Sequence, residues 1–183
     1  MEELLEKIPP EKCWAITAKT LSRLSVLRGS KIMPSTLGKV NGVISPVWGW
    51  EKWQEILNKV YTERSRRLHL FVNEKFNVPV EDAIGAAKLE MIVLRLFMGP
   101  EYRDELVETT PEKTVIKITK CPWDERFKEF DVDPTLRGAC EVHQEAWHEE
   151  AFKAINPKIS GKLVKSMSKG DPYCEVVIEF KEE

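Results

Sequence analysis

The feature that most constrains the fold is a change in the spacing of apolar residues near residue 103. Before that point, the stretches 50–76 and 79–99 place apolar residues three or four positions apart, which is the period of an amphipathic helix. The second stretch carries apolar residues around most of its circumference, which favours a central buried helix with Pro79 near its first turn and Gly99 at its end. The N-terminal half is therefore predicted to be helical.

Beyond residue 103 the apolar residues alternate with polar ones, as they do in half-buried strands. The segments 104–108 and 114–120 flank the turn-forming sequence TTPEK and predict one hairpin, while 158–167 and 172–180 flank SKGD and predict a second. In the last of these strands one face carries Cys174, Val176, Ile178 and Phe180. We expect that face to be buried.

Between the two hairpins the sequence predicts a helix from Pro134 to Ile155. Helices followed by hairpin, helix and hairpin predict an α+β fold, in which a four-stranded antiparallel sheet is covered by helices on one face. At 183 residues the chain is expected to be a single domain, with a helical half over 1–100 and a sheet-containing half over 101–183.

Charge and composition argue against several classes of partner. The formal net charge of -2 gives no electrostatic reason to expect a nucleic acid or an anionic membrane surface as a partner. No window approaches the ~18 uninterrupted apolar residues of a membrane span. The acidic start MEELLEKIPPEK lacks the features of a signal peptide, and four widely spaced cysteines fit a reducing compartment, so a cytoplasmic protein is predicted. The sequence has no phosphate-cradling or dinucleotide motif, and no nucleotide cofactor is expected.

The stretch GACEVHQEAWHEE contains the first candidate for a functional site. On the predicted helix, one stripe facing the sheet carries Leu136, Cys140, His143, Trp147 and Ala151. Cys174 lies on the facing side of the last strand, and Cys121 ends an earlier strand. Three cysteines are therefore predicted to converge beside His143.

The alternative interpretation is an ordinary core. Free cysteine is among the most buried residue types, a histidine on an inward stripe is more often a packing residue, and the spacing matches no zinc signature. His148 lies about 140° from His143 around the helix, so the two histidines are not expected to share a ligand.

The segments KCPWDERFKEF and GACEVHQEAWHEEAFKAINPKISGKLVKSMSKGDPYCEVVIEF resemble the L-2-amino-thiazoline-4-carboxylic acid hydrolase-like family. The arrangement also looks like vinyl-four-reductase and transport-particle ligand-binding domains, in which a glycine turn precedes a cysteine in the last strand. These resemblances imply an α+β fold with a buried small-molecule site, often in a homodimer formed through helices. The matched positions imply a shared site at Cys121, Cys140, Asp171 and Cys174.

The hydrolase resemblance implies action on a small cyclic substrate with a C–N or C=N bond, by one of two mechanisms. In the first, Cys121, Cys140, Cys174 and His143 bind a zinc or iron ion that activates water. In the second there is no metal, and Cys140 is a nucleophile with His143 as its base. Asp171 would orient a histidine in either mechanism, although its place in SKGD favours ordinary turn chemistry. A different class also fits, namely a non-catalytic module that binds or senses a small molecule.

Three further features of the helical half have two interpretations each. The tryptophans Trp48, Trp50 and Trp53 would line a site or pack at a helix start. The basic cluster Arg64–Arg67 would hold a carboxylate or form a solvated face in which Glu63 pairs with Arg67. His69 would join a site, but packing is the expected role. The apolar breadth of the second helical stretch predicts that the protein forms a homodimer.

Overall fold

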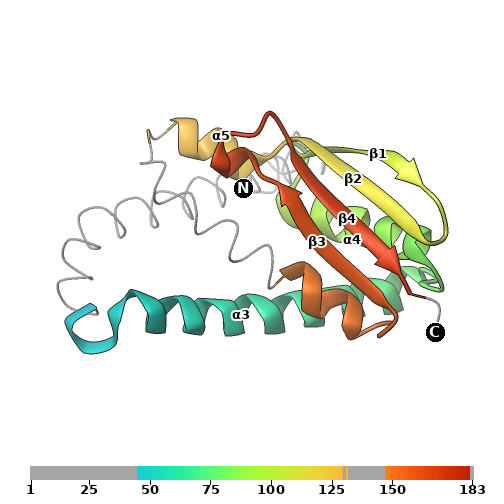
Figure 1. The fold of residues 1–183 in the computed structure, drawn as a ribbon, viewed down its shortest axis with the longest axis horizontal. Coiled ribbons are helices and arrows are strands. Elements are labelled where there is room, and N and C mark those ends of the chain that lie inside the picture. Colours follow the sequence, from blue (N-terminus) through green and yellow to red (C-terminus); the bar gives the residue numbers. More distant parts are fainter. Residues whose placement is uncertain (1–44, 130, 132–146, 182–183) are drawn as a thin grey trace, which may run out of the picture.

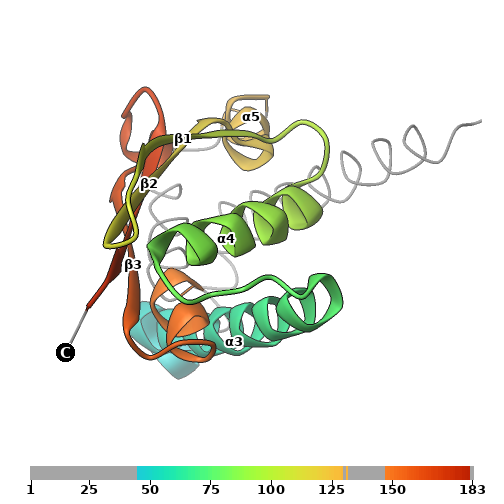
Figure 2. The same ribbon diagram turned by 90° about the vertical axis from the view of Figure 1, so that its right-hand side faces the viewer.

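The described part of the chain is a four-stranded antiparallel sheet with helices on one of its faces. The computed structural model describes residues 45–129, 131 and 147–181, and the side chains of residues 45–54, 56, 57 and 60 lie outside this description. Figure 1 shows the sheet beside the long helix α3, and Figure 2 shows α3 and α4 on the same side of the sheet. This is the predicted α+β architecture, in which helices precede strands along the chain.

The sheet consists of two hairpins whose second strands lie side by side. The strands are β1 (Arg103–Thr109), β2 (Lys113–Lys120), β3 (Ile159–Lys165) and β4 (Cys174–Phe180), in the spatial order β1-β2-β4-β3. All three pairings are antiparallel, and β2 meets β4 with Ile116 opposite Val176 and Ile118 opposite Cys174. Both predicted hairpins are confirmed.

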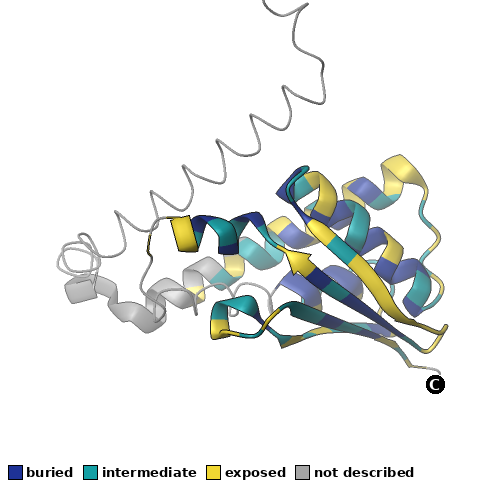
Figure 3. Ribbon diagram, turned by 90° about the horizontal axis from the view of Figure 1, so that it is seen from above, coloured by how far each residue is buried: buried dark blue, intermediate teal, exposed yellow. Residues whose placement is uncertain are grey.

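The two faces of the sheet carry different side chains, because successive strand residues point to opposite faces. Ile116, Ile118, Val176 and Ile178 are at most 6% exposed and belong to the main core beneath α4. Burying an isoleucine side chain fully contributes about 1.5–3 kcal/mol relative to leaving it exposed. The other face carries charged side chains such as Lys117 and Glu175 together with Val115 and Val177. Figure 3 shows that edge strand β1 is mostly exposed beside the more buried β2.

The helical layer consists of α3 (Ser45–Phe76) and α4 (Ala83–Met98). α4 contacts α3 and also β1, β2 and β4, and Figure 2 shows it beside α3 on the same side of the sheet. Residues on one side of α4 enter the main core, while Leu89 and Val93 on another side pack with Val72 of α3 and with Trp147. The prediction of a central buried helix is confirmed.

Residues close in sequence determine where α4 begins and ends. Asp82 is the N-cap residue, and its Oδ1 accepts a hydrogen bond of 2.8 Å from the Gly85 backbone N–H. The helix thus begins at Ala83, four residues beyond Pro79, so Pro79 lies just before the first turn and not within it. A side chain at position 85 would meet the Pro79 carbonyl oxygen at 2.2 Å, so only glycine fits there. The helix ends where predicted, at Gly99, which adopts a positive φ of 81°.

Two helical segments lie between the hairpins. The sequence pattern missed α5 (Pro122–Glu129), an eight-residue helix that follows β2 directly. Residues 147–153 are helical and form the described end of the helix predicted from Pro134 to Ile155. Trp147 is 2% exposed and Ala151 0%, so this end of the predicted stripe is buried, as expected.

The described helices include none that is both long enough and apolar enough to cross a membrane.

Candidate functional site

Glu90 is the centre of a buried polar cluster where three helical segments meet. Glu90 belongs to α4 and His69 to α3, while Trp147 and His148 belong to residues 147–153. Glu90, His69 and His148 are 0% exposed. Glutamate is almost never fully buried unless it is paired, which makes this group unusual for a core. We call these four residues the Glu90 cluster.

The carboxylate oxygens of Glu90 face nitrogen atoms from three side chains. His69 Nε2 is hydrogen-bonded to Oε2, and the Trp147 indole N–H donates to Oε1 over 3.3 Å. His148 Nδ1 lies 3.3 Å from the same Oε1 without making a hydrogen bond of acceptable geometry. The Glu90 carboxylate therefore joins α3 to α4 and to residues 147–153.

The charges within the cluster follow from this geometry. Burial raises the pKa of Glu90, but the charges and contacts of His69 and His148 outweigh it and hold that pKa well below its usual range. Burial lowers the pKa of His69, but the charge and hydrogen bond of Glu90, with the Ser65 carbonyl, raise it above its ordinary value of 6.5. We infer that Glu90 is ionised and that its contact with His69 favours the charged form of that imidazole.

Ser65, His69 and Glu90 have the residue types of a nucleophilic triad but not its arrangement of protons. The Ser65 hydroxyl donates a 2.7 Å hydrogen bond to the Trp147 carbonyl oxygen. His69 Nδ1 lies 2.8 Å from the Ser65 carbonyl oxygen, a contact that requires a proton on Nδ1. The imidazole therefore has no free lone pair to accept the serine proton, and Ser65 is 0% exposed. The arrangement is a buried ion pair tied to the backbone of α3.

Two buried polar side chains beside Glu90 lack hydrogen-bond partners. Among the described residues, no hydrogen-bond partner is found for the hydroxyl of Tyr102, which is 4% exposed, or for the ring nitrogens of His148, whose Nδ1 lies 3.3 Å from Glu90 Oε1. Burial raises the pKa of Tyr102 first of all, and the nearby charges of Asp104 and Glu90 raise it further, with smaller contributions from Cys121 and Cys174. The Tyr102 hydroxyl is thus a protonated donor and acceptor near Glu90 and both thiols. Buried polar groups without partners are rare in native proteins and require an explanation, such as a bound water or ligand.

Cys121 and Cys174 lie on the other side of Tyr102. Both are free thiols and half-buried. Burial raises the pKa of Cys121 to about 12 and also raises the pKa of Cys174. Cys174 Sγ accepts a 3.3 Å hydrogen bond from the Met167 backbone N–H. Both thiols are therefore protonated at neutral pH, so they present weakly polar and uncharged surface.

Apolar side chains that are only half-buried adjoin these thiols. Met91 of α4, Trp123 of α5, Leu163 of β3 and Met167 of the short 3-10 helix η1 (Met167–Lys169) all pack against the main core. They supply incompletely covered apolar surface beside the main core, to which Tyr102 also belongs. We define the candidate ligand site as the Glu90 cluster, Tyr102, the two thiols and these four apolar residues.

Of the predicted site residues, the structure describes Cys121, Asp171 and Cys174. Cys140 and His143 lie outside the described residues, so neither the predicted convergence nor the four-ligand metal site is tested. In the part of the chain that is described, no group of three or more His, Cys, Asp or Glu side chains is placed to hold a metal ion. Asp171 has the turn role that its sequence context favoured, because its Oδ2 accepts a 2.8 Å hydrogen bond from the Ser166 N–H.

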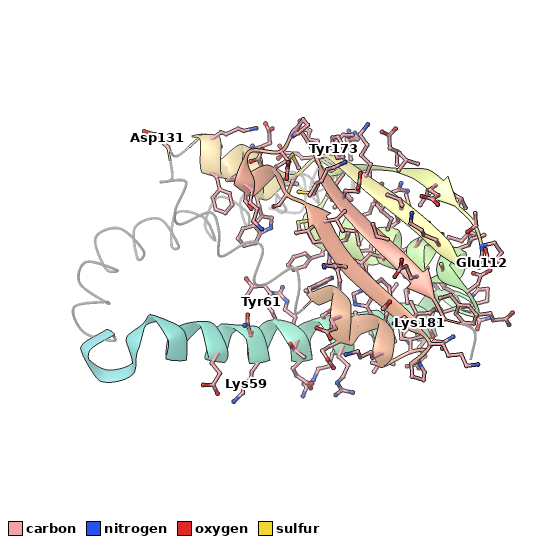
Figure 4. All side chains as sticks on the ribbon, viewed as in Figure 1. Lys59, Tyr61, Glu112, Asp131, Tyr173 and Lys181 are labelled. Carbon is pink, nitrogen blue, oxygen red and sulfur yellow. The ribbon has the colours of Figure 1, made fainter. Side chains whose placement is uncertain are left out.

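The outer face of the sheet is a solvated charged surface. Lys117 pairs with Glu105, and Lys165 pairs with Glu175. The ammonium groups of both lysines lie within 5 Å of the centre of the Tyr173 ring, which Figure 4 labels at the start of β4. These contacts satisfy the charges of that face among themselves, so the candidate site is on the inner face.

The basic cluster of α3 also has described contacts. Arg66 and Arg67 both bind Glu63, with Arg66 Nε at 3.1 Å, and they lower the pKa of Glu63 to about 2. The predicted pair of Glu63 with Arg67 is confirmed. The guanidinium of Arg64 lies 4.6 Å from the centre of the Phe97 ring, which ties α3 to α4.

Sequence reasoning missed Glu90 and Tyr102 as site residues and assigned His69 to packing. One signal was available, because Glu90 interrupts an otherwise apolar face in a helix that was expected to be buried. A carboxylate at such a position needs a buried partner, and the sequence offers three histidines for that role, His69, His143 and His148. No sequence pattern marked Tyr102 as a site residue, because tyrosine is common in protein cores.

The fold is similar to that of two solved ligand complexes. Subunit 3 of the trafficking protein particle complex from Naegleria fowleri, covalently bound to palmitic acid, matches with a TM-score of 0.52 and 13% identity over 91% of this chain and 96% of that chain. The phenol-responsive sensory domain of the transcription activator PoxR, solved with phenol, matches with a TM-score of 0.52 and 10% identity over 89% of this chain and 74% of that chain. At these identities the likeness shows the fold alone, and it confirms the predicted similarity to transport-particle domains.

Neither a family model nor a curated protein sequence matches the chain. Membership of the hydrolase-like family stays a prediction.

Proposed function

We propose that this protein is a small-molecule-binding domain that holds a ligand with an apolar body and one hydrogen-bonding group between α4 and the sheet. This is the binding alternative considered from the sequence. The observation that carries it is the Tyr102 hydroxyl, which is buried without a hydrogen-bond partner among the described residues and lies near enough to Asp104 and Glu90 for their charges to raise its pKa. A ligand that exchanges a hydrogen bond with this hydroxyl removes the cost of leaving it unpaired.

The surroundings of Tyr102 support an apolar ligand body. The thiols of Cys121 and Cys174 are uncharged, and the half-buried side chains of Met91 and Trp123 add apolar surface. Ligand sites are typically lined by apolar side chains with a few polar groups that set orientation. The two proteins of similar fold bind palmitic acid and phenol, which are both apolar molecules with one oxygen-bearing group.

The hydrolase alternative has less support from the described residues. Ser65, His69 and Glu90 carry their protons in the wrong places for nucleophilic catalysis. The half-buried Cys121 is held as a thiol rather than as a thiolate, which is the nucleophilic form. The hydrolase mechanism proposed from the sequence depends on Cys140 and His143, which lie outside the described residues.

The test combines ligand recovery with a substitution that removes one atom. Protein purified without added ligand is extracted with organic solvent and the extract is analysed by mass spectrometry. The same protein is titrated with phenol and with hexadecan-1-ol while its melting temperature is followed. Tyr102→Phe should weaken binding of either probe about 5-fold, because a neutral hydrogen bond contributes about 1 kcal/mol.

The stability of Tyr102→Phe separates a ligand role from a structural one. Removing an unpaired hydroxyl should leave the free protein equally stable or slightly more stable, since no hydrogen bond is lost. Tyr173→Phe is the matched control, because Tyr173 lies on the outer face of the sheet. A protein that yields no small molecule and whose melting temperature responds to neither probe would contradict the proposed function.

A further inference from the structure

We propose that the site selects an uncharged ligand, whose polar group is a hydroxyl or an amide, and excludes the carboxylate of the same skeleton. This inference rests on the proposed function and names the chemical class of the ligand. It follows from how the charges around Tyr102 are already paired.

The two carboxylates near the Tyr102 hydroxyl, Glu90 and Asp104, are each paired with a cation from a described residue. His69 donates to Glu90 with one ring nitrogen and to the Ser65 carbonyl with the other. Asp104, whose side chain is 1% exposed, holds Arg95 through contacts of 2.6 and 2.9 Å to its Oδ1. Each of these cations faces its carboxylate rather than an open position in the site.

A ligand carboxylate would therefore enter a buried region in which these two cations are already paired, so neither would be its counter-charge. The Oδ2 atom of Asp104 is buried without a hydrogen-bond partner among the described residues, so one of the two oxygen atoms of this carboxylate is already unsatisfied. His148 Nδ1 lies 3.3 Å from Glu90 Oε1, so a charge on this imidazole would already face the Glu90 carboxylate. Like charges that share a buried site disfavour each other strongly.

A neutral polar group suits the same atoms. The Tyr102 hydroxyl can both donate and accept a hydrogen bond. A ligand hydroxyl can therefore donate to it or accept from it, and it brings no charge that needs a partner. The protonated thiols of Cys121 and Cys174 add no charge that would attract an ion.

The experiment compares two pairs of probes that share a skeleton. Affinities for phenol and benzoate, and for hexadecan-1-ol and palmitate below its micellar range, are measured at pH 7 by calorimetry or by the quenching of tryptophan fluorescence. Each neutral member should bind at least about 100-fold more tightly than its carboxylate, because the anion would be buried without a counter-charge. Equal or tighter binding of the carboxylates would overturn the inference and leave the proposed function intact.

The variant Glu90→Gln tests whether charge is the cause. Removing one of the two anions should reduce the preference for the neutral probe at least about 10-fold, mainly by improving carboxylate binding. Glu149→Gln is the control, because the Glu149 side chain is 63% exposed and pairs with Lys153. An unchanged preference in a folded Glu90→Gln protein would refute the charge argument. If no probe binds and no molecule is recovered from the purified protein, the proposed function fails and the inference fails with it.

Discussion

Replacing Glu90 by leucine should destabilise the protein strongly, because it removes one partner of a buried ion pair. The substitution leaves the His69 imidazole without its acceptor and the Trp147 indole N–H without its carboxylate, at positions that are 0% and 2% exposed. Breaking a buried pair in this way costs about 3–5 kcal/mol. For a chain of this size about 1 kcal/mol shifts the melting temperature by about 2–4 °C, so the expected loss is about 6–20 °C.

The same cluster should give the stability a definite dependence on pH. The folded-state pKa of Glu90 is lowered from 4.5, so its contribution is present above pH 4.5 and is lost as the pH falls below that value. The folded-state pKa of His69 is raised from 6.5, so its contribution is present below pH 6.5 and is lost as the pH rises through the folded-state value. The difference in stability between wild type and Glu90→Leu should therefore be largest between about pH 4.5 and 6.5.

The assay is urea unfolding followed by circular dichroism, repeated at intervals from pH 4 to pH 9. Glu90→Gln is the informative companion, because a glutamine amide can donate to a neutral His69 Nε2 and accept from Trp147. It should cost less, about 1–2 kcal/mol, and should remove the alkaline decline that His69 causes. The control Glu149→Gln should stay within about 0.5 kcal/mol of wild type. A Glu90→Leu protein as stable as wild type at pH 6 would refute the buried ion pair.

Three further predictions concern packing, a thiol and a turn. Gly161→Ala should cost about 1–3 kcal/mol in urea unfolding, because an added Cβ would meet the Phe152 ring at 2.3 and 2.6 Å; an unchanged midpoint would contradict the close packing of that ring against β3. Cys121 should be alkylated about a thousandfold more slowly in the native protein than in urea at pH 8, since its pKa is raised from 9.0 to about 12; peptide mapping by mass spectrometry measures this, and equal rates would count against it. Asp171→Ala should lower stability by about 1–2 kcal/mol through the lost bond to the Ser166 N–H, with ligand affinity unchanged; a large loss of affinity would instead support a role of Asp171 in the site.

The fold was largely predictable because each element has its own local signal. The alternation that puts Val176 and Ile178 on one face depends only on the geometry of a strand, so the buried face of β4 followed from the sequence. Gly99 ended α4 as expected because few other residues adopt its positive φ. The missed helix α5 is short and strongly polar, with charged residues at most of its positions, so its few apolar residues showed no helical period.

The site was less predictable because it depends on contacts between residues far apart in the sequence. His69 and Glu90 are 21 positions apart, and Glu90 and Trp147 are 57 apart. Helical phase within residues 134–155 predicted a buried Trp147 but could not show that His148, on a neighbouring face, would be covered by α3 and α4. Sequence patterns identify which residues share a face of one element, whereas the partner of a buried charge is set by the packing of several elements.

A buried ion pair is weak evidence for stability, since apolar residues of matching volume are often at least as stabilising. Stability alone therefore does not explain why charge is placed between α3, α4 and residues 147–153. The neighbouring Tyr102 and His148 suggest another reason, because both lack the hydrogen-bond partners that a purely structural cluster would supply. The Glu90→Gln variant separates the two explanations. If the cluster serves only to hold the helices together, the variant should lose stability while its preference between phenol and benzoate stays the same. If Glu90 also sets the charge of the ligand site, the preference should fall even where the loss of stability is small.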